Sequence, residues 1–193
     1  MTPLRVDEEL EIVPWRPEHA EAMFAAVERN RGYLRQWLPW LDHVKTLDDE
    51  RAFITRCVAQ EHADNGFHAG VWRAGRIVGT LGFHYVDRAN RKTEIGYWVD
   101  ESEQGRGIAT RCCRAACDLA FGEWKLNRVV IFCATRNERS RAVPERLGFT
   151  LEGVYRQAEW QYDHFVDLAA YAMLASEWHR RGGATDGKRD GTV

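Results

Sequence analysis

The sequence lacks the features that mark a membrane, secreted or metal-binding protein. No segment approaches the ~18 apolar residues of a membrane span, and the acidic start MTPLRVDEELEIV does not resemble a signal peptide. The five cysteines are odd in number and form no paired Cys-x-x-Cys, and the seven histidines form no His-Glu-x-x-His. We therefore expect a cytoplasmic protein with buried, reduced thiols, no metal and no contact with a membrane.

An excess of charge of one sign is also missing. The chain has 27 basic and 29 acidic residues, and its formal net charge of −2 gives no indication of direct nucleic-acid binding. Its 193 residues, 45% of them hydrophobic, suit one domain with a sizeable core, which we expect at residues 1–179. The polar, glycine-rich segment 180–193 predicts a disordered tail.

The hydrophobic period changes several times along the chain and indicates an α/β fold. The expected elements, in chain order, are a strand at 10–13, helices at 17–30 and from Asp48 or Asp49 to about Asn65, strands at 67–73, 76–86 and 93–100, a helix at 108–121, a strand at 128–135, a helix at 137–147, and strands at 150–160 and 165–174. This order predicts a mixed sheet with helices on both faces.

A glycine-rich turn, residues 101–107, joins the strand at 93–100 to the helix at 108–121. The first N–H groups of a helix lack partners inside it and lie beside the positive end of the dipole, so such a turn suits an anion such as phosphate. Gly105 and Gly107 are not followed by the third glycine of a Rossmann fingerprint, and no Gly-Lys-Ser/Thr of a P-loop is present. On the two glycines alone, a plain turn is the favoured interpretation.

The sequence around this turn resembles the GCN5-related N-acetyltransferase (GNAT) superfamily. QGRGIA, residues 104–109, fits the family signature Q/R-x-x-G-x-G/A, and NERS (137–140) followed by ERLGF (145–149) resembles its second conserved block. EIGYWV (94–99) and YDHFVDLAAYAML (162–174) are similar to the RimJ/RimL branch, which acetylates ribosomal-protein N-termini and other amines.

The resemblance extends from Leu10 to about Trp178. It implies a GNAT fold, which is a mixed, mainly antiparallel sheet of about seven strands with a V-shaped splay between two central strands. It also implies an acyl-CoA-dependent N-acyltransferase that uses acetyl-CoA, releases CoA and needs no metal.

The same resemblance implies the residues that bind the donor. The expected pyrophosphate-binding residues are Gln104, Gly105, Arg106, Gly107, Ile108 and Ala109. The backbone of Trp98 and Val99 would pair with the pantetheine arm, and a backbone N–H near Tyr97 or Trp98 would stabilise the oxyanion. Asn137 would bond the pantetheine amides or cap the helix that follows it. Arg106 would meet phosphate charge or remain a solvated surface side chain.

Two side chains are expected to act in catalysis. Glu94 lies in an otherwise apolar strand, where a carboxylate is costly unless it faces a cleft or has a partner. It is therefore the candidate base that deprotonates the amine, and an ion pair with an arginine across the sheet is the alternative. Ser140 matches the family's Asn-x-x-Ser position and is the candidate acid, or else only a capping residue. Pro144 stands where many members carry a tyrosine acid, so that acid is absent.

The amine acceptor is the least determined part of the interpretation. We expect the N-terminal amine of a (ribosomal) protein to attack acetyl-CoA directly in a ternary complex. The alternatives are a small-molecule amine, such as a polyamine or an antibiotic, and a non-catalytic acyl-CoA-binding module. The aromatic residues that line an acceptor groove, or else belong to the core or to a homodimer interface, are Tyr33, Trp37, Trp40, Tyr85 and Trp160. The acidic residues that would attract a cationic amine are Glu152, Glu159 and Asp163.

Overall fold

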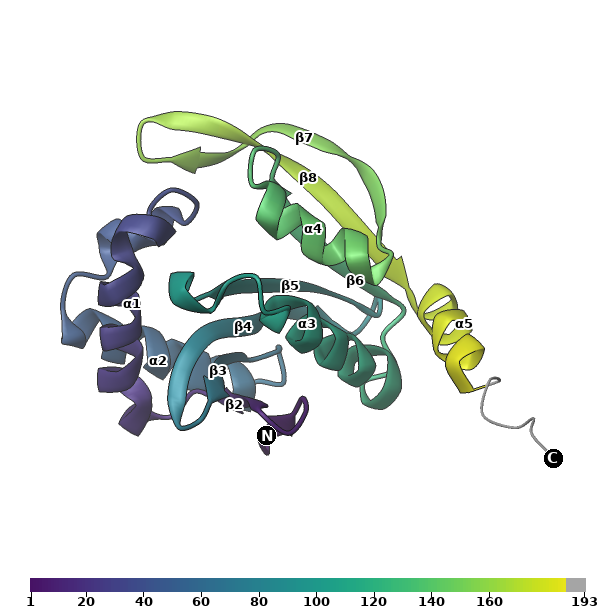
Figure 1. Ribbon diagram of the computed structural model, residues 1–193, viewed down its shortest axis with the longest axis horizontal. Coiled ribbons are helices and arrows are strands. Elements are labelled where there is room, and N and C mark those ends of the chain that lie inside the picture. Colours follow the sequence, from purple (N-terminus) through teal and green to yellow (C-terminus); the bar gives the residue numbers. More distant parts are fainter. Residues whose placement is uncertain (187–193) are drawn as a thin grey trace.

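One eight-stranded sheet runs through the whole protein (Figure 1). The structure is a computed structural model that describes residues 1–186. The strands are β1 (Leu4–Arg5), β2 (Leu10–Pro14), β3 (His68–Arg73), β4 (Arg76–Asp87), β5 (Lys92–Val99), β6 (Arg128–Ala134), β7 (Thr150–Gln161) and β8 (His164–Leu174). The α-helices are α1 (Ala20–Leu34), α2 (Leu47–His62), α3 (Ile108–Asp118), α4 (Glu138–Leu147) and α5 (Ala175–Asp186). The short 3₁₀ helices are η1 (Pro17–His19), η2 (Pro39–His43) and η3 (Glu101–Glu103), and η4 (Leu119–Glu123) is a short π-helix.

The strand order is β1-β2-β3-β4-β5-β6-β8-β7, and every neighbouring pair is antiparallel except β5 and β6. Helices α1 and α2 pack in one apolar cluster with Ile77 and Trp98, whereas α3 and α4 pack in another with Ile95 and Ile131. This arrangement confirms the predicted mixed, mainly antiparallel sheet with helices on both faces. The sheet has eight strands rather than about seven because Leu4–Arg5 pairs with β2 at its edge.

The two central strands part soon after they begin to pair. Strand β5 pairs with β6 only from Lys92 to Glu94, opposite Arg128 to Val130. Beyond Glu94, β5 continues beside β4 alone, up to Val99 opposite Gly79. The two strands therefore form the predicted V-shaped splay, which leaves one side of the β5 backbone without a neighbouring strand.

The register of β5 decides which of its backbone groups face the splay. The Asp100 N–H donates to the Val78 carbonyl at 2.8 Å, so the even-numbered residues of β5 direct their backbone groups at β4. Alternation along the strand then directs the N–H and C=O groups of Ile95, Tyr97 and Val99 to the open side.

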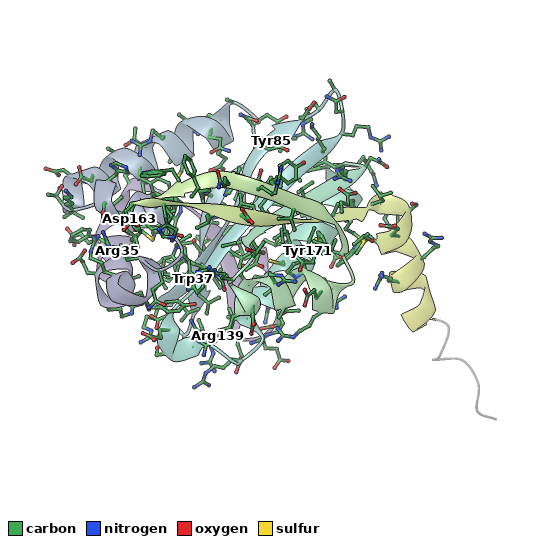
Figure 2. All side chains as sticks on the ribbon, turned by 90° about the horizontal axis from the view of Figure 1, so that it is seen from above. Arg35, Trp37, Tyr85, Arg139, Asp163 and Tyr171 are labelled. Atoms are coloured by element: carbon green, nitrogen blue, oxygen red, sulfur yellow. The ribbon has the colours of Figure 1, made fainter. Side chains whose placement is uncertain are left out.

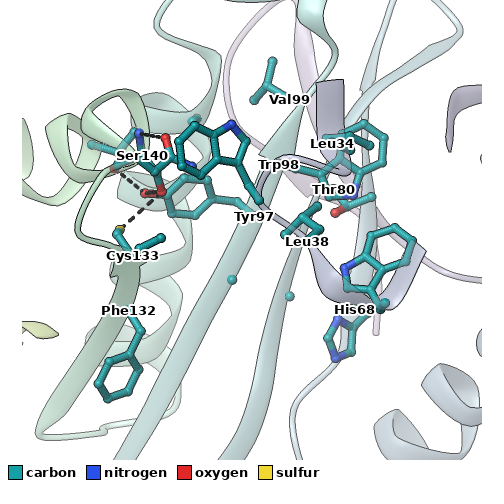
Figure 3. A pocket seen from close by; sticks show the side chains of 18 of the residues that line it. Leu34, Leu38, His68, Thr80, Tyr97, Trp98, Val99, Phe132, Cys133 and Ser140 are labelled. Carbon is teal, nitrogen blue, oxygen red and sulfur yellow. Dashed lines mark hydrogen bonds between the residues drawn. The ribbon is translucent and has the colours of Figure 1, made fainter. Parts of the chain in front are cut away.

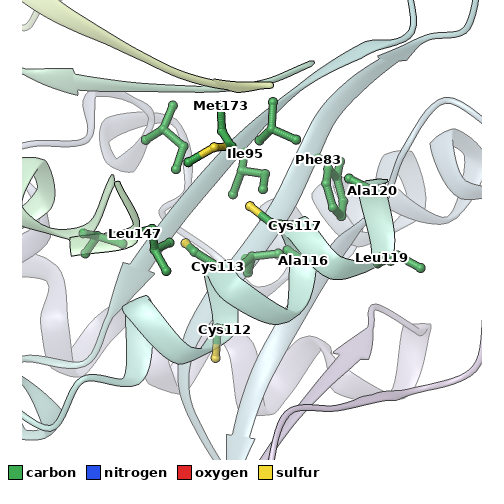
Figure 4. Close-up of a cluster of buried hydrophobic side chains, with 14 of the residues drawn as sticks. Phe83, Ile95, Cys112, Cys113, Ala116, Cys117, Leu119, Ala120, Leu147 and Met173 are labelled. Carbon is green, nitrogen blue, oxygen red and sulfur yellow. The ribbon is translucent and has the colours of Figure 1, made fainter. Parts of the chain in front are cut away.

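The larger apolar cluster seats α3 against the sheet (Figure 4). Cys113 and Cys117 of α3 are fully buried and lie near Ile95 and Met173 of the strands. All five cysteines are buried and free, as expected, and burial raises the pKa of Cys112 to about 12. These thiols therefore stay protonated and act as small apolar side chains.

Helix α2 begins with a reciprocal cap that differs from the prediction. Thr46 is the N-cap, and its hydroxyl oxygen accepts the Asp49 N–H at 3.2 Å, while the Asp49 carboxylate accepts the Thr46 N–H at 2.9 Å. The predicted helix start at Asp48 or Asp49 is thus wrong, because Thr46 caps the helix and supplies the first half of a capping box, and Asp49 supplies the second.

The C-terminal segment continues as a helix where disorder was expected. Helix α5 extends through Asp186, and the rest of the predicted tail, 187–193, lies outside the described residues. Tertiary contacts hold this helix, since the Trp178 Nε1–H donates to Asp118 at 2.7 Å and the Arg181 guanidinium donates to the Gly148 carbonyl at 3.0 Å. Neither partner is close in sequence, so the polar composition alone gave no sign of them.

The long β7–β8 hairpin reaches across the splay to the end of α1 (Figure 1). At its tip, the Gln161 side-chain amide donates to the Gln36 carbonyl at 2.8 Å and the Tyr162 hydroxyl donates to the Leu38 carbonyl at 2.6 Å. The Arg35 guanidinium lies 4.0 Å from the centre of the Tyr162 ring, and Figure 2 shows Arg35 beside the hairpin tip. The hairpin thereby bridges the two sides of the open sheet.

We predict that Thr46→Ala lowers the free energy of unfolding by about 1 kcal/mol, because it removes the side-chain cap of α2. Thr55→Ala is the matched control, since the Thr55 hydroxyl bonds only the Arg51 carbonyl within the same helix. Urea denaturation of both variants and the wild type measures the difference. Equal stability of Thr46→Ala and Thr55→Ala would contradict a capping contribution.

Candidate active site

A cavity of about 1870 Å³ lies at the splay (Figure 3). It is lined by strands β3 to β8, by the start of α3, by α4, and by the α1–α2 region. The sequence-predicted site residues that line it are Glu94, Trp98, Val99, Gln104, Gly105, Gly107, Ile108, Ala109, Asn137 and Ser140. Arg106 does not line it. The fold therefore brings nearly all of the predicted residues to one cavity.

The glycine-rich turn lines one end of this cavity and suits an anion. Gly105 and Gly107 have φ values of +76° and +70°, which an L side chain rarely adopts. Gly107 is the N-cap of α3, and no side chain caps the helix. The first N–H groups of α3 thus face the cavity at the positive end of the helix dipole. These residues fit a pyrophosphate, as the sequence predicts.

The arginines around the turn are placed differently from expectation. Arg106 is half exposed and its guanidinium lies 3.2 Å from the Glu103 carboxylate, and Arg111 lies 2.7 Å from Asp7. Arg106 is therefore the solvated, ion-paired side chain of the alternative interpretation. Arg111 and Arg139 both line the cavity, and Arg139 hydrogen-bonds the Gln104 side chain. The packing of α4 brings Arg139 beside the turn, and the sequence analysis did not predict this position.

Two predicted contacts to the pantetheine arm have another local role. The Asn137 side-chain oxygen accepts the Ser140 N–H at 3.1 Å, so Asn137 caps α4. Trp98 directs its backbone at β4, whereas Val99 and Tyr97 direct theirs into the splay. The backbone groups available to a strand-like ligand are therefore those of Tyr97 and Val99, and Trp98 contributes its side chain to the cavity wall.

A tyrosine hydroxyl does reach the predicted acid position, but from β5 rather than α4. The Tyr97 hydroxyl donates to the Ser140 carbonyl at 2.8 Å, and the Ser140 hydroxyl lies 3.4 Å from Tyr97 and 3.2 Å from the Cys133 sulfur (Figure 3). Pro144 explains this geometry. It has no N–H for the carbonyl four residues earlier, so the Ser140 carbonyl is free to accept Tyr97.

Glu94 has a histidine partner rather than an arginine. Its carboxylate lies 2.9 Å from His84 Nδ1, and the Glu94 side chain is 22% exposed. The His84 ring stacks on His68 with ring centres 5.6 Å apart. Burial, and then the neighbouring His84, lower the pKa of His68 to about 4, so His68 is neutral near pH 7.

Two glycines make room for these rings. A Cβ at Gly82 would collide with the His68 ring, and a Cβ at Gly96 would collide with the His84 ring. Both glycines are in register on neighbouring strands, and all four residues line the cavity. Sequence reasoning missed both histidines, although two glycines inside buried strands were a signal that another group approaches closely.

A second carboxylate faces Glu94 from the hairpin. Glu159 of β7 lines the cavity, and its pKa is raised by burial and then by the negative charge of Glu94. Of the three acidic candidates, Glu152 instead pairs with Arg128, and Asp163 pairs with His164 at 2.7 Å on the exposed hairpin tip. Of these three candidates, Glu159 alone lines the cavity together with Glu94.

The aromatic candidates divide in the same way. Tyr33, Trp37 and Trp40 line the cavity at the α1–α2 end. Tyr85 does not line it, and Trp160 is 53% exposed on the hairpin, with its ring centre 4.8 Å from that of Phe165. Three of the five predicted residues thus contribute to a groove wall.

A carboxylate that the sequence analysis overlooked lies at this aromatic end. Glu50 of α2 is 1% exposed, lines the cavity, and its Oε2 has no hydrogen-bond partner. Burial raises its pKa to about 7, with the nearby Arg31 charge opposing the rise. Its spacing from Ile54 and Cys57, four and seven residues, marks the buried stripe of α2 and could have shown that a charge is buried there.

No helix among residues 1–186 is long and apolar enough to cross a membrane. The same residues contain no group of three or more histidine, cysteine, aspartate or glutamate side chains arranged to hold a metal ion.

Comparison with known proteins places this geometry in a family. Residues 9–150 match the model of the acetyltransferase (GNAT) domain. YdaF of Bacillus subtilis (strain 168), whose assignment as a ribosomal N-acetyltransferase is provisional, is 38% identical over 175 residues, covering 90% of this chain and 96% of YdaF. The ribosomal-protein-serine acetyltransferase of Escherichia coli is 30% identical over 171 residues, covering 89% of this chain and 96% of the relative.

The solved structures agree with the sequence relatives. A RimL alpha-N-protein acetyltransferase, solved in complex with coenzyme A, has a TM-score of 0.86 at 28% identity, and the match covers 89% of this chain and 97% of RimL. The fold and the cavity are thus those of an acyltransferase whose donor is a coenzyme A thioester. The chain belongs to the GNAT acetyltransferase family, and it is an acetyl-CoA-dependent acetyltransferase with a RimL-like fold.

We predict that Glu50→Gln stabilises the protein at pH 8 more than at pH 5. A carboxyl whose folded pKa is raised, here from 4.5 to about 7, lowers the free energy of unfolding as the pH rises between those values. The variant removes that cost, which is greatest above pH 7. Melting temperatures at both pH values measure it, with the exposed Glu8→Gln as control. A lower melting temperature of Glu50→Gln at pH 8 would show that the carboxylate is structurally required.

Proposed function

We propose that this enzyme transfers the acetyl group of acetyl-CoA to the N-terminal amine of a protein, with ribosomal proteins as the first candidates. The observation that carries this proposal is one cavity that joins the uncapped glycine turn to the facing carboxylates of Glu94 and Glu159. The relatives named as ribosomal-protein acetyltransferases support the choice of acceptor. Such an acceptor also implies action in the cytoplasm.

The donor is held by backbone groups at the splay. The N–H groups from Gln104 to Ala109 bind the pyrophosphate, and Arg139 adds a positive charge beside them. The open backbone side of β5, at Tyr97 and Val99, pairs with the pantetheine arm as an additional strand would. When bound, acetyl-CoA supplies a thioester carbonyl that a neutral amine can attack. The Tyr97 N–H faces the splay and stabilises the negative charge that develops on that carbonyl oxygen.

Glu94 acts as the base. An amine is mostly protonated near pH 7, so a proton must leave before it attacks directly in a ternary complex. The Glu94 carboxylate takes this proton, directly or through a water molecule, and His84 at 2.9 Å holds the carboxylate in place. Because the His84 side chain is 46% exposed, it also connects Glu94 to solvent. Glu159, on the opposite side, attracts the cationic amine before it loses its proton.

Ser140 and Tyr97 act together at the leaving thiolate. The Ser140 hydroxyl is 3.4 Å from the Tyr97 hydroxyl and lies on the cavity wall. Ser140 donates the proton to the sulfur and regains one from solvent in the cavity. Tyr97 orients Ser140, because its hydroxyl accepts from the Ser140 hydroxyl and donates to the Ser140 carbonyl. Tyr97 is itself anchored by the Ser140 carbonyl that Pro144 leaves free. The absence of a tyrosine at position 144 is thereby compensated from the neighbouring strand.

A small-molecule amine is the second candidate acceptor. The aromatic end of the cavity, at Tyr33, Trp37 and Trp40, lies beside the segment that the hairpin tip contacts. An aromatic wall suits a small cationic amine, whereas an N-terminal peptide needs only the part near Glu94. Both acceptors use the same chemistry at the thioester.

An acceptor screen tests the proposed function. We expect free CoA to be released when the enzyme is incubated with acetyl-CoA and peptides that carry the N-terminal sequences of ribosomal proteins. The same peptides with a blocked N-terminus are the control, and polyamines and aminoglycosides form the comparison set. Turnover on small amines with none on any peptide would replace the first candidate by the second.

We predict that Glu94→Gln lowers kcat/KM by about 10²- to 10⁴-fold, the usual contribution of a general base. Glu152→Gln is the control, because Glu152 pairs with Arg128 outside the cavity. The loss of the Glu94 charge also lowers the pKa of Glu159, which moves any Glu159-dependent limb of the pH–rate profile to lower pH. If Glu94→Gln kept a kcat/KM close to that of the wild type and Glu159→Gln were inactive, the base would be Glu159.

A further inference from the structure

The aromatic end of the cavity contains a carboxylate in a position where the helix would otherwise be apolar. Glu50 continues the buried stripe of α2 that Ile54 and Cys57 form. Its side chain is only 1% exposed, yet it borders the cavity. A charge in such a position lowers stability, so its presence requires a compensating contact.

No such contact is present within the described residues. The Glu50 Oε2 atom is buried from solvent and accepts no hydrogen bond. Arg31 is the cation that influences Glu50 most, but its guanidinium donates to the Leu41 carbonyl at 2.8 Å and also to Val44 and Glu28. Arg31 is thus engaged elsewhere, and Glu50 retains unused capacity to accept hydrogen bonds.

The neighbouring wall suits a positively charged group. Tyr33, Trp37, Trp40 and Phe53 line the same cavity as Glu50, and Tyr33, Trp40 and Phe53 pack on the apolar cluster that contains Ile54 and Cys57. Aromatic faces attract ammonium groups, and a desolvated carboxylate beside them provides the counter-charge. A neutral apolar ligand would satisfy the rings and leave Glu50 unpaired, so the combination favours a cation that donates hydrogen bonds.

We propose that Glu50 is the anchor of a subsite for a second, non-reacting ammonium group of the acceptor. This inference rests on the proposed function, because it places the reacting amine between Glu94 and Glu159 of the same cavity. The enzyme then prefers acceptors that carry two amines, such as a diamine, or an N-terminus with a lysine close to it, over otherwise equal acceptors with one amine. Glu50 is a specificity-determining residue that does not touch the reacting atoms.

Matched acceptors that differ only in the second amine test the subsite. The probes are 1,4-diaminobutane, 1,6-diaminohexane and 1,8-diaminooctane, each paired with the monoamine of the same chain length. Titration calorimetry on the CoA-bound protein gives binding constants that do not depend on turnover, and steady-state assays with acetyl-CoA give kcat and KM for each acceptor. We expect the wild type to prefer at least one diamine over its monoamine by about 10- to 100-fold, the range for a charge-assisted hydrogen-bonded contact.

Glu50→Gln is expected to abolish this preference with an increase in KM rather than a fall in kcat. Glu50→Asp keeps the charge on a shorter side chain and should retain part of the preference, and it replaces Glu50→Gln if that variant fails to fold. Glu101→Gln, an exposed carboxylate on the same cavity wall, is the control and should keep the wild-type preference.

Two results would overturn the subsite. One is a wild type that binds each diamine no better than its monoamine, and the other is a Glu50→Gln variant that keeps the wild-type preference. The proposed function is judged separately by turnover. If the wild type binds diamines through Glu50 but acetylates no amine, the proposed acetyl transfer fails while the subsite stands. If it acetylates amines without any diamine preference, the subsite fails and the proposed function stands.

Discussion

The parting of β5 from β6 is the constraint on which the rest of the site depends. Two parallel strands that stay paired would satisfy each other's backbone groups along their length, but here the pairing ends at Glu94. Two consequences follow from that one break. The β5 backbone at Tyr97 and Val99 becomes available to a ligand, and the cavity opens between α3 and α4. The side chains of β5 alternate between the two faces of the sheet, as in any strand. Glu94 then faces the histidines of β3 and β4, whereas Tyr97 faces Ser140.

The two faces of β5 carry different chemistry as a result. On one face lie the titratable side chains of Glu94, His84 and Glu159, and the His84 side chain is nearly half exposed to solvent. On the other face, Tyr97, Ser140 and Cys133 form a short buried chain of donors, and burial keeps the pKa values of Tyr97 and Cys133 above their usual ranges. In the proposed mechanism, Glu94 takes the amine proton on the exposed side and Ser140 protonates the leaving thiolate on the other side. The alternation of side chains along β5 separates these two roles across the width of a single strand.

Much of this arrangement could be predicted from the sequence, because its signals are local. The glycines of the turn, the Asn137 cap with Gly148 at the other end of α4, and the alternation of strand 92–99 each depend on residues within a few positions of one another. The features that the sequence analysis did not predict have a different origin. Thr46 was overlooked although its capping-box partner is three residues away, but the α5 contacts, the place of Arg139 and the His84 partner of Glu94 join residues that are distant in sequence or on neighbouring strands.

The sequence by itself determined the family, the element order and the glycine-rich turn before α3, because those properties follow from periodicity and from residues adjacent along the chain. Only the tertiary structure decided which charges share a cavity. It turned Arg106 outward to Glu103 and set Arg139 beside the turn, and it selected Glu159 from three acidic candidates. It also placed Glu50 inside without a partner. Charge interactions depend on distance and burial, and both are fixed by packing between segments that the linear order leaves far apart.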